Sequence, residues 1–94
     1  MSIRRLSLDV DKVIDRPDMI ALAHALERVA GVDAINITVT EIDIETVGTD
    51  VTVEGDDIDT GALFAAIEEV GAVLHSIDEV VAGTRVIEHV KRSR

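Results

Sequence analysis

One stretch, residues 31–46, constrains the fold of this chain most, because its apolar side chains change sides partway along. The stretch reads GVDAINITVTEIDIET. Its apolar residues stand first at odd positions and then at even positions: Ile35, Ile37 and Val39, followed by Ile42 and Ile44. Successive side chains of a strand point to opposite faces. One regular strand over 32–46 therefore cannot bury both sets against the same helices.

Two arrangements would resolve this reversal. A bulge near Thr40 could reset the register. Alternatively, the second half of the strand could bury Ile42 and Ile44 against another subunit rather than against its own helices. We favour the second arrangement, which predicts a homo-oligomer with these two isoleucines at the contact.

Length and composition predict a single domain over residues 1–94 with an aliphatic core. Ninety-four residues are close to the common size for one core. Phe64 is the only aromatic residue, and the absence of cysteine excludes disulfides and thiolate metal sites. No apolar run approaches the roughly 20 residues of a membrane-spanning helix, and no export signal starts the chain. We therefore expect a cytoplasmic protein without membrane contact.

The charge of the chain is strongly negative, with 19 acidic and 9 basic side chains and a formal net charge of −10. Such a chain repels phosphate backbones and lacks the basic stripe of nucleic-acid-binding proteins, so no nucleic-acid partner is expected. The acids are spread along the chain. This pattern favours an acidic solvation shell adapted to a salt-rich cytoplasm over binding of cations or basic partners.

The order of predicted elements is β-α-β-β-α-β. The first strand alternates over 3–13, with Leu6, Leu8 and Val10 on one face. We expect a helix capped by Asp15 and ended by Gly31, and a second helix capped by Asp59 or Thr60 and ended by Gly71. The remaining predicted elements are given by range: a long strand over 32–46, a turn near 47–50, a strand from 51 to 54, and a last strand over 72–80.

This order is typical of a ferredoxin-like α+β sandwich, in which two right-handed crossovers place both helices on one face of a four-stranded antiparallel sheet. The expected strand order is four, one, three, two. The sandwich core spans 3–81, and residues 84–94 form a C-terminal extension. Within it, 84–90 fits a short helix slightly better than a strand, and 91–94 is expected to fray.

Two segments carry a resemblance to a known family. The string HSIDEVVAG over 75–83 and the segment running from Asn36 to Thr46 resemble an archaeal family of domains of unknown function, number 211. The likeness extends from the first strand to about Val90. It implies a ferredoxin-like fold and ring-like homo-oligomers, and it implies no function. The chain departs from the family in its basic terminus and its few lysines.

The acids of the reversing strand are a candidate metal site. Glu41, Asp43 and Glu45 alternate along one face, and Asp78 of the last strand is a further candidate ligand. Such oxygen ligands suit Ca²⁺ or Mg²⁺, but one copy could not complete a shell of six to eight ligands. We therefore predict either a cation site shared between subunits or a solvated acidic edge that limits aggregation.

The last strand holds His75, Ser76 and Asp78, which do not form a nucleophilic trio, because His75 points away from the other two on a strand. If Ile77 faces the helices, so does His75, and both are then expected to be partly buried near a subunit contact. The predicted interface thus comprises Ile42, Ile44, His75 and Ile77.

We therefore expect a homo-oligomeric binding or regulatory module that holds a divalent cation or a small polar ligand at its subunit interfaces. The alternative is a divalent-metal-dependent enzyme with an acidic site between subunits. No nucleotide-binding or metalloprotease motif is present in the sequence.

Overall fold

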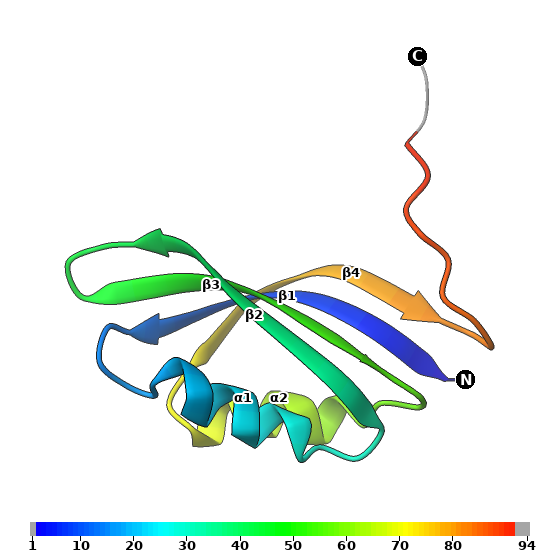
Figure 1. Cartoon of the computed structure of the whole chain (residues 1–94), viewed down its shortest axis with the longest axis horizontal. Coiled ribbons are helices and arrows are strands. Elements are labelled where there is room, and N and C mark those ends of the chain that lie inside the picture. Colours follow the sequence, from blue (N-terminus) through cyan, green and yellow to red (C-terminus); the bar gives the residue numbers. More distant parts are fainter. Residues whose placement is uncertain (1, 92–94) are drawn as a thin grey trace.

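The computed structural model describes residues 2–91 and confirms the ferredoxin-like α+β sandwich (Figure 1). Both helices cover one face of a four-stranded sheet, and the other face is left open. No helix in this described part of the chain is long and apolar enough to cross a membrane. The elements in chain order are β1 Ile3–Val13, α1 Met19–Glu27, β2 Val32–Ile42, β3 Thr46–Gly55, α2 Thr60–Glu69 and β4 Val73–Ala82.

The sheet is antiparallel throughout, and its strand order is β2-β3-β1-β4, as predicted. β1 lies at the centre because it pairs with β3 on one side and with β4 on the other. β2 and β4 are the two edge strands, so each leaves one row of backbone hydrogen-bonding groups unpaired within the sheet.

The core lies between the sheet and the two helices. Leu6, Leu8 and Val10 of β1 point into it, in agreement with the alternating pattern of this strand. β3 contributes Val51 and Val53, which stand directly opposite Leu8 and Leu6. The helices complete the core with Leu22, Leu26, Leu63 and Ile67, all fully buried. The inward-facing side chains of the strands and the apolar stripes of the two helices thus pack into one aliphatic core.

Helix α1 differs from the prediction at both ends. Its N-cap is Asp18, whose Oδ1 accepts a hydrogen bond from Ala21 N at 2.7 Å, so the expected cap by Asp15 is wrong. The helix ends at Glu27 with Arg28 as its C-cap, before Gly31. Gly31 instead has φ +89°, and its carbonyl oxygen accepts the amide of Asp56 at 2.9 Å. Gly31 therefore allows two backbone segments to approach closely, and it does not end the helix.

Helix α2 follows the prediction. Asp59 is its N-cap and accepts a hydrogen bond from Ala62 N at 3.0 Å. Val70 is the C-cap, and Gly71 follows it with φ +94°, the left-handed conformation expected after a helix.

The β2–β3 hairpin turns earlier than predicted. β2 ends at Ile42 and β3 begins at Thr46, so the predicted turn near residues 47–50 is wrong and Gly48 lies inside β3. The turn closes with a hydrogen bond from Asp43 N to Thr46 O at 2.8 Å. The strong alternation from Val47 to Val53 is explained by one longer strand whose inward side chains are Val47, Thr49, Val51 and Val53.

The backbone of β2 compensates for the reversal in the sequence pattern. The β2–β3 ladder shifts register between Val39 and Glu41, which leaves Thr40 as the extra residue. The bulge that we considered the less favoured alternative is therefore present. It does not bury the isoleucines: Ile42 is 68% exposed and Ile44 is 88% exposed. The hairpin extends beyond the helices, so its far end has no layer to cover it (Figure 1).

β4 also departs from regular alternation. Its ladder with β1 shifts register near His75 and near Asp78. The side chain of His75 is 65% exposed, so the expectation that it is partly buried beside the helices is wrong. Beyond Gly83, residues 84–91 adopt no regular structure, and the expected short helix is absent from this described segment. The rest of the end expected to fray, residues 92–94, lies outside the described part.

Candidate functional site

The predicted metal ligands lie in two separate places. Glu41 lies at the end of β2, and Asp43 and Glu45 lie in the hairpin turn. Asp43 Oδ1 accepts the amide of Ile44 at 2.8 Å, which stabilises the turn. Asp78 lies on β4, at the opposite edge of the sheet.

A single copy does not bring these four carboxylates together. Within residues 2–91 no group of three or more His, Cys, Asp or Glu side chains could hold a metal ion. A cation site built from these residues therefore needs a second copy, as the prediction of a shared site requires.

The polar side chains of β4 do not form a nucleophilic site. Ser76 Oγ donates a hydrogen bond to Asp78 Oδ1 at 2.9 Å, so these two share a side, as expected. His75 Nδ1 lies 3.7 Å from Asp11 Oδ2 of β1, and no hydrogen bond joins it to Ser76 among the described residues. A base that does not contact the hydroxyl cannot activate it.

The predicted interface residues also lie at opposite edges. Ile42 and Ile44 stand at the end of the β2–β3 hairpin, whereas His75 and Ile77 stand on β4. Ile77 is opposite Leu8 and is 47% exposed at the edge of the sheet. A hollow of about 310 Å³ lies between α2 and the start of β4 and is lined by Phe64, Glu68, Ala72, Val73 and Leu74.

The open face of the sheet is acidic. The register places Asp9 directly opposite Asp50, and Asp11 opposite Gly48. The two strands therefore hold like charges face to face, an arrangement that destabilises a sheet. Among the described residues, no lysine or arginine forms an ion pair with any of these three aspartates.

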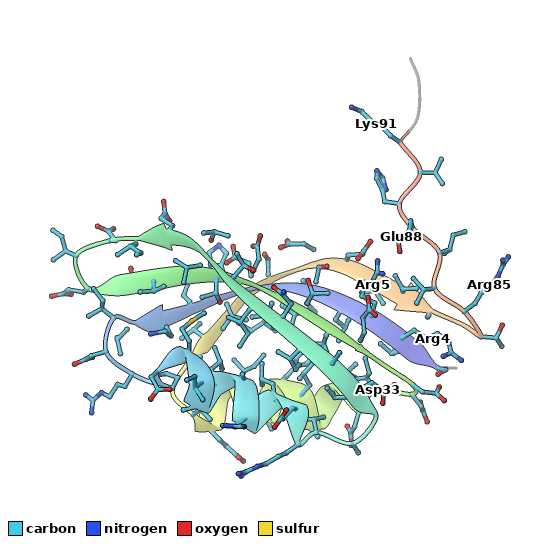
Figure 2. All side chains as sticks on the ribbon, viewed as in Figure 1. Arg4, Arg5, Asp33, Arg85, Glu88 and Lys91 are labelled. Atoms are coloured by element: carbon cyan, nitrogen blue, oxygen red, sulfur yellow. The ribbon has the colours of Figure 1, made fainter. Side chains whose placement is uncertain are left out.

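Arg5 forms a charged cluster that the sequence analysis missed. Its Nε lies 2.9 Å from Glu54 Oε2, and its two terminal nitrogens bind both carboxylate oxygens of Glu88 at 2.8 and 2.9 Å. Glu79 Oε1 is 3.7 Å from Nη1. Figure 2 shows Arg5 on β1 beneath Glu88 of the C-terminal segment.

The cluster shifts the ionisation of its members. The hydrogen bond from Arg5 lowers the pKa of Glu88 below its ordinary value, and Coulomb attraction adds to this. The hydrogen bond to Glu88 is also the main cause that raises the pKa of Arg5, although burial opposes it. The pairing with Glu54 follows from strand register and could have been inferred from the sequence. The pairing with Glu88 could not, because the segment that carries Glu88 has no periodic pattern.

Comparison with known proteins assigns this chain to a family. The model of domain of unknown function family 211, described as "Uncharacterized ArCR", matches residues 4–94. An uncharacterized protein of Methanocaldococcus jannaschii is 44% identical over 89 residues, which cover 95% of this chain and 91% of the relative. The resemblance noted in the sequence is thereby confirmed, and the chain belongs to the archaeal family of domains of unknown function number 211.

Proposed function

We propose that this protein is a homo-oligomeric binding or regulatory module whose subunits contact one another head to tail. The end of the β2–β3 hairpin of one copy would meet β4 of the next. The observation that carries this proposal is the exposure of Ile42 and Ile44, at 68% and 88%, on a hairpin whose end is not covered by any of residues 2–91. Exposed aliphatic clusters in soluble proteins commonly mark interaction surfaces.

The partner surface is argued from β4 and α2. Ile77 and Val80 are 47% and 55% exposed along β4, and the hollow beside α2 is lined in part by Phe64 and Leu74. An isoleucine of a neighbouring hairpin would fill part of this hollow. Hairpin and hollow are different surfaces, so the contact is heterologous. Such contacts close into rings when the rotation between copies permits it.

The same contact would assemble the divalent-cation site. Glu41, Asp43 and Glu45 surround the isoleucines of the hairpin, and Asp78 follows Ile77 on β4. Docking the hairpin on β4 would bring carboxylates of two copies to one place. Carboxylate oxygens are the ligands that Ca²⁺ and Mg²⁺ prefer, and several are needed to replace the hydration shell.

The assembly is tested by Ile42→Asp, with mass measured by light scattering and sedimentation and the fold measured by far-ultraviolet circular dichroism. We expect loss of the oligomer with the fold retained. Ile20→Asp is the matched control, because Ile20 is 71% exposed on α1 and lies outside the proposed contact. An oligomer that survives Ile42→Asp, or a wild-type chain that is monomeric, would contradict the proposal.

The cation site is tested by calorimetry with Ca²⁺ and Mg²⁺ on the wild-type protein and on Asp43→Asn and Asp78→Asn. We expect each variant to weaken binding, because each removes one charged ligand. The control is Asp33→Asn, at an exposed position of β2 that the site does not use. If the wild-type protein gives no heat of cation binding, or if neither variant changes that heat, the proposed cation site is wrong. The proposed assembly would then still be tested by the mass measurements.

A further inference from the structure

The C-terminal arm, defined here as residues 84–91, and the three residues that follow it in the sequence carry charge opposite to that of the rest of the chain. Residues 84–94 hold four of the nine basic side chains and one of the nineteen acids: Arg85, Lys91, Arg92 and Arg94 against Glu88. The arm has no regular structure. It also exposes Val86, Ile87 and Val90, of which Val90 is 72% exposed. The arm is thus a basic, partly apolar segment that belongs to neither the sheet nor the helices.

In the described structure, the arm is held to its own chain near its root, at Gly83, and near its middle, at Glu88. Gly83 N donates to Ser2 O at 2.8 Å, and Arg4 Nε donates to Gly83 O at 2.7 Å. The bidentate pair of Glu88 with Arg5 is the next contact. Among the described residues, no other hydrogen bond or ion pair ties 84–91 to the sandwich. Between Glu88 and Lys91 the arm stands away from the sheet, and Lys91 is directed off it (Figure 2).

The open face of the sheet has the complementary charge. Asp9, Asp11 and Asp50 lie on its two central strands, and their register puts Asp9 against Asp50. Arg5 is engaged by Glu54 and Glu88 at one end of this face. Lys12 points to the opposite face, where its Nζ donates to Val13 O at 3.1 Å. Asp11 has His75 of its own chain 3.7 Å away. Among the described residues, Asp9 and Asp50 form no ion pair with a cation of their own chain.

We propose that the C-terminal arm of one copy lies across the acidic open face of a neighbouring copy, with Lys91 near Asp9 and Asp50. The inference rests on the proposed self-association and adds a second contact that uses a different surface from the hairpin and β4. The occupant is a second copy rather than the same chain, because the Arg5–Glu88 pair directs the arm off its own sheet. Opposite charges on the two surfaces would favour and orient this contact.

The absence of cysteine makes a cross-linking test clean. A full-length chain with Lys91→Cys is mixed with a tagged full-length chain that carries Asp50→Cys, and the mixture is oxidised with diamide. We expect a disulfide-linked heterodimer on a non-reducing gel. The control partner is Glu69→Cys, exposed on α2 on the other side of the sheet. Because docking raises the local thiol concentration, the yield with Asp50→Cys should exceed that of the control by roughly tenfold or more.

A double variant, with Lys91→Cys and Asp50→Cys in one chain, tells whether the arm lies on a neighbouring copy or on its own sheet. Linked multimers support the proposal, whereas an internally linked monomer shows that the arm folds back on its own sheet and overturns it. An oligomer that gives no heterodimer above the control overturns the arm contact and leaves the hairpin contact standing. A wild-type chain that is monomeric in sedimentation overturns both. Raising the salt concentration should lower the cross-linked yield, because exposed charges are screened.

Discussion

Arg5 and Glu88 are 83 positions apart in the sequence, and they form the only bidentate ion pair in the described structure. The pair joins the first strand of the sheet to a segment that follows the last one. It therefore decides where the C-terminal arm leaves the sandwich, although neither residue contributes to the apolar core. Four predictions follow from this and other named contacts.

The Arg5–Glu88 pair should make the arm sensitive to acid. The pKa of Glu88 is lowered in the folded state from an ordinary value of 4.5. The pair therefore stabilises the arm fully above that value, and the contribution is lost as pH falls through the lowered pKa. The raised pKa of Arg5 has its effect only in strongly alkaline solution. We expect the heteronuclear NOE of residues 85–90 to fall on acidification.

The variant Glu88→Gln is the control for this experiment. It should show a low NOE in the arm at every pH and should remove the acid transition, since the titrating carboxyl is gone. Its thermal unfolding should stay close to that of the wild-type chain, because the arm does not contact the helices. An arm that is equally ordered in Glu88→Gln would contradict the role given to this pair.

The N-cap of α1 offers a test that separates Asp18 from Asp15. Asp18→Ala removes the acceptor of the Ala21 amide and should lower the free energy of unfolding by about 1 kcal/mol. Asp15→Ala should change it by less than about 0.5 kcal/mol, because its exposed side chain caps no helix. Urea unfolding measures both. Equal effects of the two variants would show that the helix begins elsewhere.

Two glycines should respond in opposite ways to alanine. At Gly55 a Cβ would overlap the carbonyl group of Gly31, which lies in close contact there. Gly55→Ala should therefore destabilise the chain by roughly 1–3 kcal/mol through forced separation of the two segments. Gly61 lies in α2, and the nearest atom to an added Cβ is Asp59 Oδ1 at 3.7 Å. Gly61→Ala should stabilise by about 0.5–1 kcal/mol.

Chemical denaturation of the two glycine variants under the same conditions checks this contrast. If both variants destabilise equally, the close approach of Gly31 and Gly55 is not what limits the substitution. Hydrogen exchange at Asp56 supplies an independent readout, since its amide donates to Gly31 O at 2.9 Å. That amide should exchange faster in Gly55→Ala only.

The opposed aspartates of the open face should repel each other measurably. Asp50→Asn removes the like charge opposite Asp9 and should raise the free energy of unfolding by roughly 0.2–1 kcal/mol at low ionic strength. The gain should shrink with added salt, because both carboxylates are near solvent. The control Asp33→Asn has no carboxylate directly opposite in the ladder. Unfolding is measured in dilute protein, so that contacts between copies do not contribute.

Much of the fold could be predicted from local patterns. The alternation of β1, the stripes of the two helices and the chain order predicted the sandwich and its strand order, because each pattern specifies one buried face. For α2, the sequence predicted a cap at Asp59 or Thr60 and an end at Gly71, because such residues act on the backbone next to them. The structure selects Asp59. The cap of α1 was predicted at the wrong aspartate, because two acids near its start, Asp15 and Asp18, satisfy the same local rule.

The candidate site was predicted less well. The sequence placed three acids along one strand, but the strand ends at Ile42, so Asp43 and Glu45 lie in the hairpin turn. The sidedness of β4 could not be predicted, because two register shifts near His75 and Asp78 interrupt its alternation. The Arg5–Glu88 pair joins segments whose approach depends on the path of the chain after Gly83.

By itself, the sequence determined that two isoleucines follow a change of side within one strand. Only the tertiary structure decided that a bulge at Thr40 resets the register, so that Ile42 stands opposite the inward-facing Val47, and that Ile42 and Ile44 nevertheless stay exposed. The physical reason is that side-chain direction is a local property of the backbone. Burial depends on what lies above a residue, and the two helices end before they reach the tip of the hairpin.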